Sequence, residues 1–178
     1  MRRLLIPGLL LAGYSFAWAR KSGIVKLKHF SSTEFAPWWP MMNRQLVQTL
    51  DDLRGRWGYP ILISPALGSL GRTLGPGNES QHNVTMWGEV RGADVMPKTL
   101  GADGKLRGLI HGSEREIFFN LAADMGFTGI GVYPAWKPYP GFHLDVRKNR
   151  VVGDPARWAG VPGDGGKQAY VDVNRAFV

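Results

Sequence analysis

The sequence predicts an α+β protein in which helices flank a small antiparallel sheet. Segments with helical periodicity and segments with strand-like alternation do not follow one another regularly, as they would in a parallel βαβ sheet. The 24 glycines and 12 prolines among 178 residues indicate long ordered loops and limited regular structure. A composition of 44% hydrophobic and 20% charged residues is typical of a folded globular protein, and the length fits one domain.

Residues 1–19, MRRLLIPGLLLAGYSFAWA, have the parts of an export signal in the usual order. Two arginines precede an apolar run, and residues 17–19 match an A-x-A cleavage site. Without cleavage, the arginines would keep the N-terminus inside and make the segment a signal anchor at a membrane. A buried segment of the domain is a further alternative. We therefore expect residues 1–19 to be a signal peptide or signal anchor and residues 20–178 to form the folded domain.

A helix is predicted over residues 42–57, followed by a strand over residues 60–64. Four apolar side chains recur at helical spacing on one face: Met42, Leu46, Leu50 and Leu53. Gly58 is suited to end this helix, and the PILIS that follows is typical of a buried strand. The glycine-rich residues 68–78 lack the Lys-Ser/Thr of a phosphate-binding loop, so we expect a loop over the functional site.

A strand is expected over residues 90–96, ended by Pro97, and a second helix over residues 113–125. Ser113 and Glu116 have the spacing of a capping box at the start of this helix. Its apolar stripe is expected to consist of Ile117, Leu121 and Met125.

The last third of the chain predicts mainly strands. Residues 129–133 and 142–147 are expected to form an antiparallel pair. Residues 152–166 are expected to be irregular, and residues 170–174 are expected to add a last short strand.

The absence of cysteine and the positive charge narrow the chemistry. Without cysteine, a metal site must use histidines and carboxylates, and neither a disulfide nor a cysteine nucleophile is available. A net charge of +8 and a pI near 10.0 suggest an anionic partner such as nucleic acid, a membrane surface or the bacterial envelope. The basic residues are spread along the chain without a nucleic-acid-binding motif, so we expect no nucleic-acid partner.

Two histidines and an aspartate form the candidate metal site. His82 lies in a polar loop, Asp94 in a strand-like run and His143 in the alternating strand FHLDVR. Two imidazoles and a carboxylate are a common protein contribution to a catalytic zinc, with a fourth position left for water. In a strand, Asp145 and Arg147 fall on the face of His143, and burial of that face is costly without a purpose. The alternative is that this face is solvated.

The residues of this region resemble the zinc D-Ala-D-Ala peptidases that act on peptidoglycan. The motifs that carry the resemblance are, in order, Ser80-x-His82, Gly92-x-Asp94-Val95, GIGVYP and FHLDVR. The family includes bacterial carboxypeptidases and phage endolysins and shares its fold with the hedgehog signalling domain. The resemblance covers most of the chain and implies a small antiparallel sheet flanked by helices. It also implies one Zn²⁺ with His82, Asp94 and His143 as its ligands.

The chain departs from the family pattern at the second ligand. The family's Asp follows the first His by seven residues, a spacing that Glu89 has here, whereas Asp94 follows His82 by twelve. Asp94 is still the expected ligand because its neighbours match the family's strand, and an inserted turn, VTMWG, accounts for the longer spacing.

Two further departures concern the acid–base residue and the substrate contacts. Many members carry an acid three residues before the last His, where this chain has Pro140. We therefore expect Asp145, or in second place Glu89, to act as the general base. The family's Ser-x-x-Arg after the first strand is also missing. The residues expected to bind substrate are Arg72, Arg91 and Ser80. Gln81, Tyr133 and Trp136 are expected as cleft wall or plain packing.

The resemblance implies zinc-assisted hydrolysis of peptide bonds in bacterial peptidoglycan, with stem peptides as the partner. Phage lysis or entry would be the setting, or remodelling of a bacterial wall. The protein would be exported to the periplasm or cell envelope or carried on a virion, and anchored to a membrane if residues 1–19 remain. A non-catalytic module that only binds peptidoglycan is the alternative, and Pro140 favours it. A basic nucleic-acid-binding protein is a third possibility that rests on charge alone.

Overall fold

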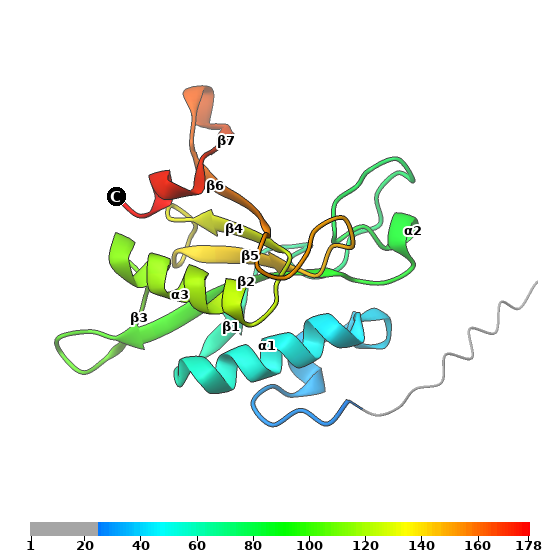
Figure 1. The fold of residues 1–178 in the computed structure, drawn as a ribbon, viewed down its shortest axis with the longest axis horizontal. Coiled ribbons are helices and arrows are strands. Elements are labelled where there is room, and N and C mark those ends of the chain that lie inside the picture. The colour runs from blue at the N-terminus through cyan, green and yellow to red at the C-terminus, as the bar shows by residue number, and fades with distance from the viewer. Residues whose placement is uncertain (1–24) are drawn as a thin grey trace, which may run out of the picture.

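The computed structural model describes residues 25–178 as a seven-stranded sheet with two long helices on one face (Figure 1). The strands are β1 Ile61–Ile63, β2 Gly92–Leu100, β3 Leu106–Gly108, β4 Gly129–Tyr133, β5 Gly141–Asp145, β6 Ala156–Pro162 and β7 Gln168–Val171. The helices are α1 Arg44–Trp57, α2 Val84–Trp87 and α3 Gly112–Asp124. The strand order is β1-β2-β5-β4-β6-β7, and β3 pairs with the far end of β2. The α+β prediction is confirmed.

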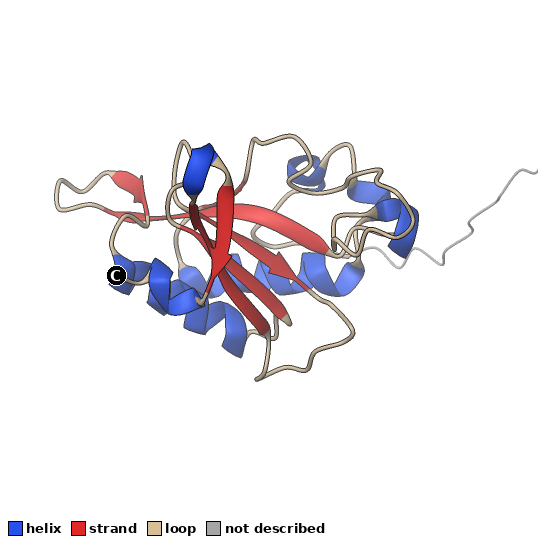
Figure 2. Cartoon of the chain, turned by 90° about the horizontal axis from the view of Figure 1, so that it is seen from above, coloured by secondary structure: helices blue, strands red, loops and turns tan. Residues whose placement is uncertain are grey.

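The core lies between the sheet and the two long helices, α1 and α3 (Figure 2). Alternate residues of the central strands face the helices and are fully buried, among them Val95, Ile130, Phe142 and Leu144. The residues between them point to the opposite face of the sheet. That second face therefore carries the polar residues of the FHLDVR strand and their neighbours.

Helix α1 confirms the first predicted helix. The side chain of Asn43 caps its first turn by accepting a hydrogen bond from the Leu46 amide at 3.1 Å. Leu46, Leu50 and Leu53 are fully buried along one face. Gly58 follows the last turn with φ of +77°, a left-handed conformation that glycine adopts without strain.

Helix α3 is present, but its buried face and cap differ from the prediction. Ile117 is 61% exposed, whereas Phe118 and Ala122 are fully buried. The large aromatic ring of Phe118 packs on Phe142 of the sheet, so this side of the helix turns inward instead of the aliphatic stripe. The cap lies two residues earlier than expected, since the His111 amide donates to the Glu114 carboxylate at 3.3 Å.

Strand β2 does not end at Pro97 as predicted. It continues to Leu100 because Pro97 lies where no hydrogen bond of the ladder is lost. The pairing of β2 with β5 ends at Val95, and its pairing with β3 begins at Lys98. On the β1 side, the Lys98 amide donates a hydrogen bond to the Pro60 carbonyl. Strand β1 is confirmed as a strand, but it is shorter than predicted, and Leu62 in it is 39% exposed.

Strand β6 forms where irregular structure was expected, so that prediction is wrong. Its sequence, ARWAGVP, has no clear apolar alternation, and it is held by pairing with β4 on one side and β7 on the other. The β4–β5 pair is antiparallel, as predicted, but the β4–β6 pair is parallel. The sheet is therefore mixed and larger than the small antiparallel sheet expected. The last strand, β7, begins two residues before the predicted one.

A buried carboxylate ties the first described residues to α1. Asp51 is fully buried and accepts backbone hydrogen bonds from Lys28, His29 and Phe30 at 2.8–2.9 Å. Burial alone would raise the pKa of Asp51, but these three hydrogen bonds outweigh it and lower the pKa. The segment before α1 is thus fixed to the domain.

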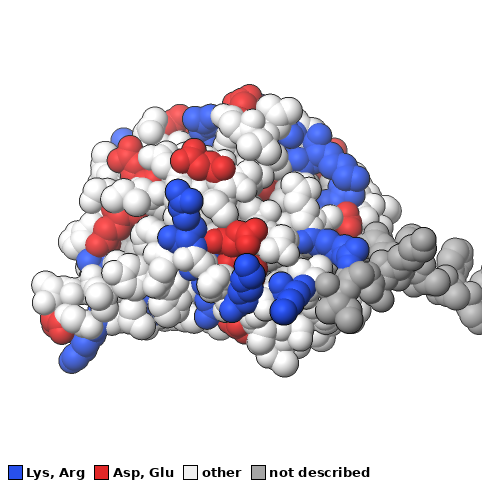
Figure 3. Space-filling view, turned by 60° about the horizontal axis from the view of Figure 1, so that its bottom comes forward, with Lys and Arg blue, Asp and Glu red and all other residues white. Residues whose placement is uncertain are grey.

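The predicted export signal, residues 1–19, lies outside the described residues. Within residues 25–178, no helix has both the length and the apolar character needed to span a bilayer. Four of the 22 basic residues precede residue 25, so half of the net charge of +8 lies in that part of the sequence. On the face drawn in Figure 3, basic and acidic side chains are interspersed.

Candidate metal centre

The candidate metal centre is built on the sheet face opposite the two long helices. Asp94 of β2 lies directly across from His143 of β5, which in turn pairs with Gly131 of β4. Gly131 pairs with Trp158 of β6 on its other side. These four residues form one row across four strands, so strand register alone brings Asp94 and His143 together.

His82 reaches this row from the loop before β2. Its backbone carbonyl accepts a hydrogen bond from the Arg72 amide at 2.8 Å, which holds it against the glycine-rich loop. The adjacent Asn83 is fully buried, and its side chain holds the glycine-rich loop in place. Its amide group donates to the Gly75 and Asn78 carbonyls, and its side-chain oxygen accepts from the Leu74 amide. The predicted loop over the site is therefore a closed structure that positions the His82 ring.

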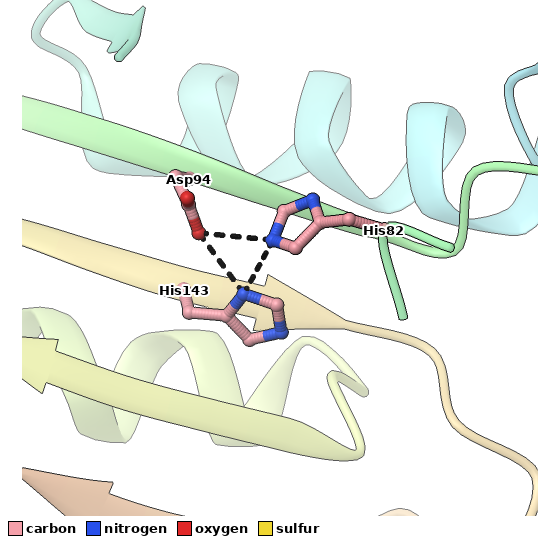
Figure 4. A group of neighbouring side chains, drawn as sticks. All are labelled: His82, Asp94 and His143. Atoms are coloured by element: carbon pink, nitrogen blue, oxygen red, sulfur yellow. Dashed lines mark hydrogen bonds and ion pairs between the residues drawn. The ribbon is translucent and has the colours of Figure 1, made fainter. Parts of the chain in front are cut away.

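The free ring nitrogens of the two histidines and one carboxylate oxygen meet at a single point (Figure 4). Nε2 of His82 lies 3.0 Å from Nδ1 of His143 and 3.2 Å from Oδ1 of Asp94. Nδ1 of His143 lies 3.0 Å from the same oxygen. All three residues are at least nine-tenths buried, with exposures of 4%, 6% and 7% for His82, Asp94 and His143. This group could hold a metal ion.

Hydrogen bonds on the far side of each ring decide which nitrogen faces the centre. Nδ1 of His82 lies 2.5 Å from the Leu70 carbonyl and must donate to it, which leaves Nε2 without a proton when the ring is neutral. Nε2 of His143 lies 2.9 Å from the Asp145 carboxylate, which leaves Nδ1 for the centre in the same way. Such partners orient metal-binding imidazoles and select their tautomer.

Asp145 is fully buried behind His143 and is paired with Arg147. The Arg147 guanidinium donates to both carboxylate oxygens, with the Nε contacts at 2.9 and 3.1 Å. Burial would raise the pKa of Asp145, but the hydrogen bonds from Arg147 and His143 outweigh it and hold the pKa well below its usual range. The alternative of a solvated His-x-Asp-x-Arg face is wrong for His143 and Asp145, which are buried, whereas Arg147 at the end of the face is partly exposed.

Asp94 and Asp145 change the pKa of His143, which lies between them. Burial would lower the pKa of His143, but hydrogen bonds to Asp145 and Asp94 raise it to about 9. Burial would raise the pKa of Asp94, but hydrogen bonds from His143 and His82 hold it well below its usual range. The two carboxylates therefore favour a positive charge at the centre.

Glycines in neighbouring strands make room for this constellation. Gly129 and Gly92 flank Asp145 on its two sides in the sheet register. A Cβ atom at Gly129 would overlap the Asp145 carboxylate, and one at Gly92 would lie 2.9 Å from Cε1 of His143. The GIG run of β4 is thus required by the side chains beside it.

The centre lies at the base of an open cleft of about 510 Å³. Arg72, Glu79, Ser80 and Arg147 are among the residues that line this cleft. The Arg72 guanidinium lies 3.7 Å from Oδ2 of Asp94 and its side chain is 42% exposed. A cationic group at the cleft wall is suited to pair with a ligand carboxylate.

Three predicted site residues, Asp145, Glu89 and Arg91, do not line the cleft. Arg91 pairs with Glu89 at 3.0 Å and lies over the Trp87 ring, 4.5 Å from its centroid. Both charged residues are largely buried there, with exposures of 9%. The turn expected between His82 and Asp94 is present as α2, and Gly88, at φ of +66°, ends it.

Two features of the cleft, Glu79 and Trp158, were not found from the sequence. Glu79 is, apart from Asp94, the one carboxylate of the described residues that lines it. Trp158 lies beside His143, with ring centroids 5.5 Å apart. Gln81, which was expected as cleft wall or plain packing, lines the cleft, and its Oε1 is the one buried side-chain oxygen or nitrogen of residues 25–178 without a hydrogen-bond partner. Glu79 lies three residues before His82, and this proximity in the sequence could have marked it as a candidate site residue.

Comparison with known proteins gives no relative: no family model, no curated protein and no solved structure matches the chain. The site must therefore be interpreted from its own geometry.

Proposed function

We propose that the protein is a zinc-dependent peptidase that hydrolyses peptide bonds in bacterial peptidoglycan, on a fold of the hedgehog and D-Ala-D-Ala peptidase type. The observation that carries the proposal is the buried group of His82, Asp94 and His143 at the base of an open cleft. Each imidazole is oriented by a partner behind it, as metal-binding histidines usually are.

The donor set fits zinc. Tetrahedral zinc with bonds of about 2.0–2.1 Å requires neighbouring donor atoms about 3.3 Å apart. The three donor atoms here are separated by 3.0, 3.0 and 3.2 Å. Two imidazoles and one carboxylate also suit zinc better than magnesium or calcium, which prefer oxygen ligands. When bound, zinc would polarise the scissile carbonyl and lower the pKa of a water molecule to about 7.

Glu79 is the residue that we propose as the proton acceptor. Asp145, the base expected from the sequence, is enclosed by His143 and Arg147, and Glu89 is paired outside the cleft. Glu79 is exposed and lines the cleft, so its carboxylate is accessible to water and substrate. Asp145 then has an orienting role, since it holds the proton on Nε2 of His143.

The reaction is amide hydrolysis with one proton relay. As water attacks the carbonyl carbon, a C–O bond forms, the C=O π electrons move to oxygen, and one water proton passes to the Glu79 carboxylate. Glu79 then gives this proton to the amide nitrogen, the C–N bond breaks with its electrons on nitrogen, and an amine and a carboxylic acid leave. Arg72 would pair with a carboxylate of the stem peptide, and Ser80 lines the same cleft.

The proposed setting is the outside of the cytoplasmic membrane. Residues 1–19 would direct export, or hold the protein at the membrane if they are not removed, and the positive charge suits an anionic envelope. Phage lysis or entry is the setting that we favour.

The proposal is tested with purified muropeptides and the full chain. We expect zinc-dependent release of peptide fragments, detected by mass spectrometry, which stops on addition of a chelator. Glu79→Gln should retain zinc and lose at least about 100-fold in rate, the usual contribution of general acid–base catalysis. Glu116→Gln, the same change at an exposed position of α3, is the matched control. No cleavage by zinc-loaded wild type would refute the peptidase.

A non-catalytic peptidoglycan-binding module is the second candidate. It is favoured by Pro140, which replaces an acid near the last ligand, and by the enclosure of Asp145. It predicts that the zinc-loaded protein binds muropeptides with micromolar or better affinity but leaves every peptide bond intact.

A further inference from the structure

Tyr133 and Trp158 form a hydrogen-bonded pair in the wall of the cleft. Nε1 of Trp158 donates to the Tyr133 hydroxyl oxygen at 2.9 Å, and both side chains line the cleft with the metal centre. Tyr133 is 6% exposed, so its hydroxyl group belongs to the base of the cleft more than to its rim. Trp158 is in the same row of the sheet as His143, which connects the pair to the metal centre.

The surrounding residues hold both rings in place. A Cβ atom at Gly131 would lie 2.5 Å from Nε1 of Trp158, and one at Gly160 would overlap the Tyr133 ring. The other side of the Tyr133 ring stacks on Trp136, with ring centroids 4.0 Å apart and planes 13° apart. The two glycines leave the space that the aromatic pair fills, so the hydroxyl oxygen has a fixed position.

The hydroxyl proton of Tyr133 remains available. Because the indole N–H occupies a lone pair of the oxygen, the phenol is an acceptor from Trp158 and can still donate its own proton. Within residues 25–178, no acceptor for this proton is present at hydrogen-bond distance. Burial, the largest effect on this group, raises the pKa of Tyr133, and the charge of Asp94 adds to it. The group therefore stays protonated, as a donor must.

We propose that Tyr133 is the hydrogen-bond donor of the cleft for the carbonyl oxygen that becomes negative during hydrolysis, and that Trp158 is a positioning residue that fixes its hydroxyl group. This inference rests on the proposed peptidase function. Tyr133 keeps its proton throughout, while the π electrons of the attacked carbonyl move to the oxygen that accepts its hydrogen bond. A fixed, preorganised donor in a buried site is the arrangement that favours an oxyanion over the neutral carbonyl.

Two measurements test Tyr133: steady-state kinetics on muropeptides, and binding of a dipeptide whose peptide bond is replaced by a phosphinate. In the zinc-loaded full chain, Tyr133→Phe should lower kcat about 100- to 1,000-fold with little change in KM, the effect of losing one such donor. Affinity for the phosphinate, which carries the negative oxygen in its ground state, should fall in parallel, and zinc content should not change. Trp158→Phe should lower kcat only about 2- to 10-fold, since one neutral hydrogen bond is lost.

The control is Tyr59→Phe, the same change at a 37% exposed tyrosine outside the cleft. Equal phosphinate affinity in wild type and Tyr133→Phe overturns the inference, and so does a wild type that does not bind the phosphinate. If wild type cleaves no muropeptide but binds the phosphinate in a Tyr133-dependent way, the donor role stands and the proposed peptidase function fails.

Discussion

Replacement of Asp145 by asparagine separates an orienting role for this residue from a catalytic one. Its carboxylate accepts from Nε2 of His143 at 2.9 Å and from the Arg147 guanidinium. Asparagine keeps the shape but replaces one oxygen by a donor. If the new NH₂ group faces His143, Nε2 must give up its proton, and the neutral ring then carries it on Nδ1, which faces the metal centre. If it faces Arg147, two donors oppose each other in a fully buried place.

Both outcomes weaken metal binding. Loss of a partner behind a metal-binding histidine typically lowers metal affinity about 10- to 100-fold, which corresponds to roughly 1.4–2.7 kcal/mol. Zinc affinity is measured by competition with a chromophoric chelator at fixed pH. Asp154→Asn, at a side chain that is 69% exposed, makes the same chemical change away from the cleft and should leave the affinity as in wild type.

An unchanged zinc affinity in Asp145→Asn would refute the orienting role. If hydrolysis were abolished at the same time, the sequence-based expectation that Asp145 is the general base would be the better account. Reduced zinc affinity, with activity restored at saturating zinc, would support the orienting role and leave Glu79 as the proton acceptor.

Two substitutions and one pH dependence test the stability of the fold. Asp51→Ala leaves the buried amide of Phe30 and the part-buried amides of Lys28 and His29 without their acceptor, and should lower the free energy of unfolding by roughly 2–4 kcal/mol, measured by urea denaturation. Gly129→Ala places a methyl group against the Asp145 carboxylate and should lower stability by about 1–3 kcal/mol and weaken zinc binding. In metal-free protein, the raised pKa of His143 contributes stability that is complete below pH 6.5 and is lost as the pH rises through about 9. Urea denaturation in the presence of a chelator should therefore show unfolding free energy falling by up to ~3 kcal/mol across this range.

Each of these has an outcome that contradicts it. Gly75→Ala, where a Cβ atom meets nothing within 4 Å, should be close to neutral, and an equal loss at Gly75 and Gly129 would show that crowding is not the cause. A metal-free stability that is flat between pH 6.5 and 9 would contradict the imidazolium state of His143. Wild-type stability in Asp51→Ala would show that water replaces the lost acceptor.

The elements with strong periodicity could be predicted from the sequence, and the others depended on long-range pairing. Helix α1 follows directly from its leucine spacing and Gly58. Strand β6 has no such pattern and exists because β4 and β7 supply its hydrogen bonds. The buried side of α3 was misjudged because Ile117 fits a helical stripe, while the sheet accepts Phe118.

The candidate metal-binding group could be predicted from residue types, but the surroundings of its side chains could not. His82, Asp94 and His143 come together as expected. The role of Asp145 depends on which ring nitrogen of His143 faces the centre, and the partners on both sides of the ring decide that. Glu89 has a suggestive spacing, yet the α2 turn carries it to Arg91, away from the cleft.

The most direct test of the metal centre is the zinc content of the purified full chain, measured by mass spectrometry of the metal, for wild type, His143→Ala and His29→Ala. His29 is an exposed histidine outside the centre and controls for non-specific binding. We predict one zinc per chain in wild type and in His29→Ala, and almost none in His143→Ala. A folded wild type without zinc after incubation with the metal, or equal zinc in all three proteins, would contradict the metal centre and the peptidase function built on it.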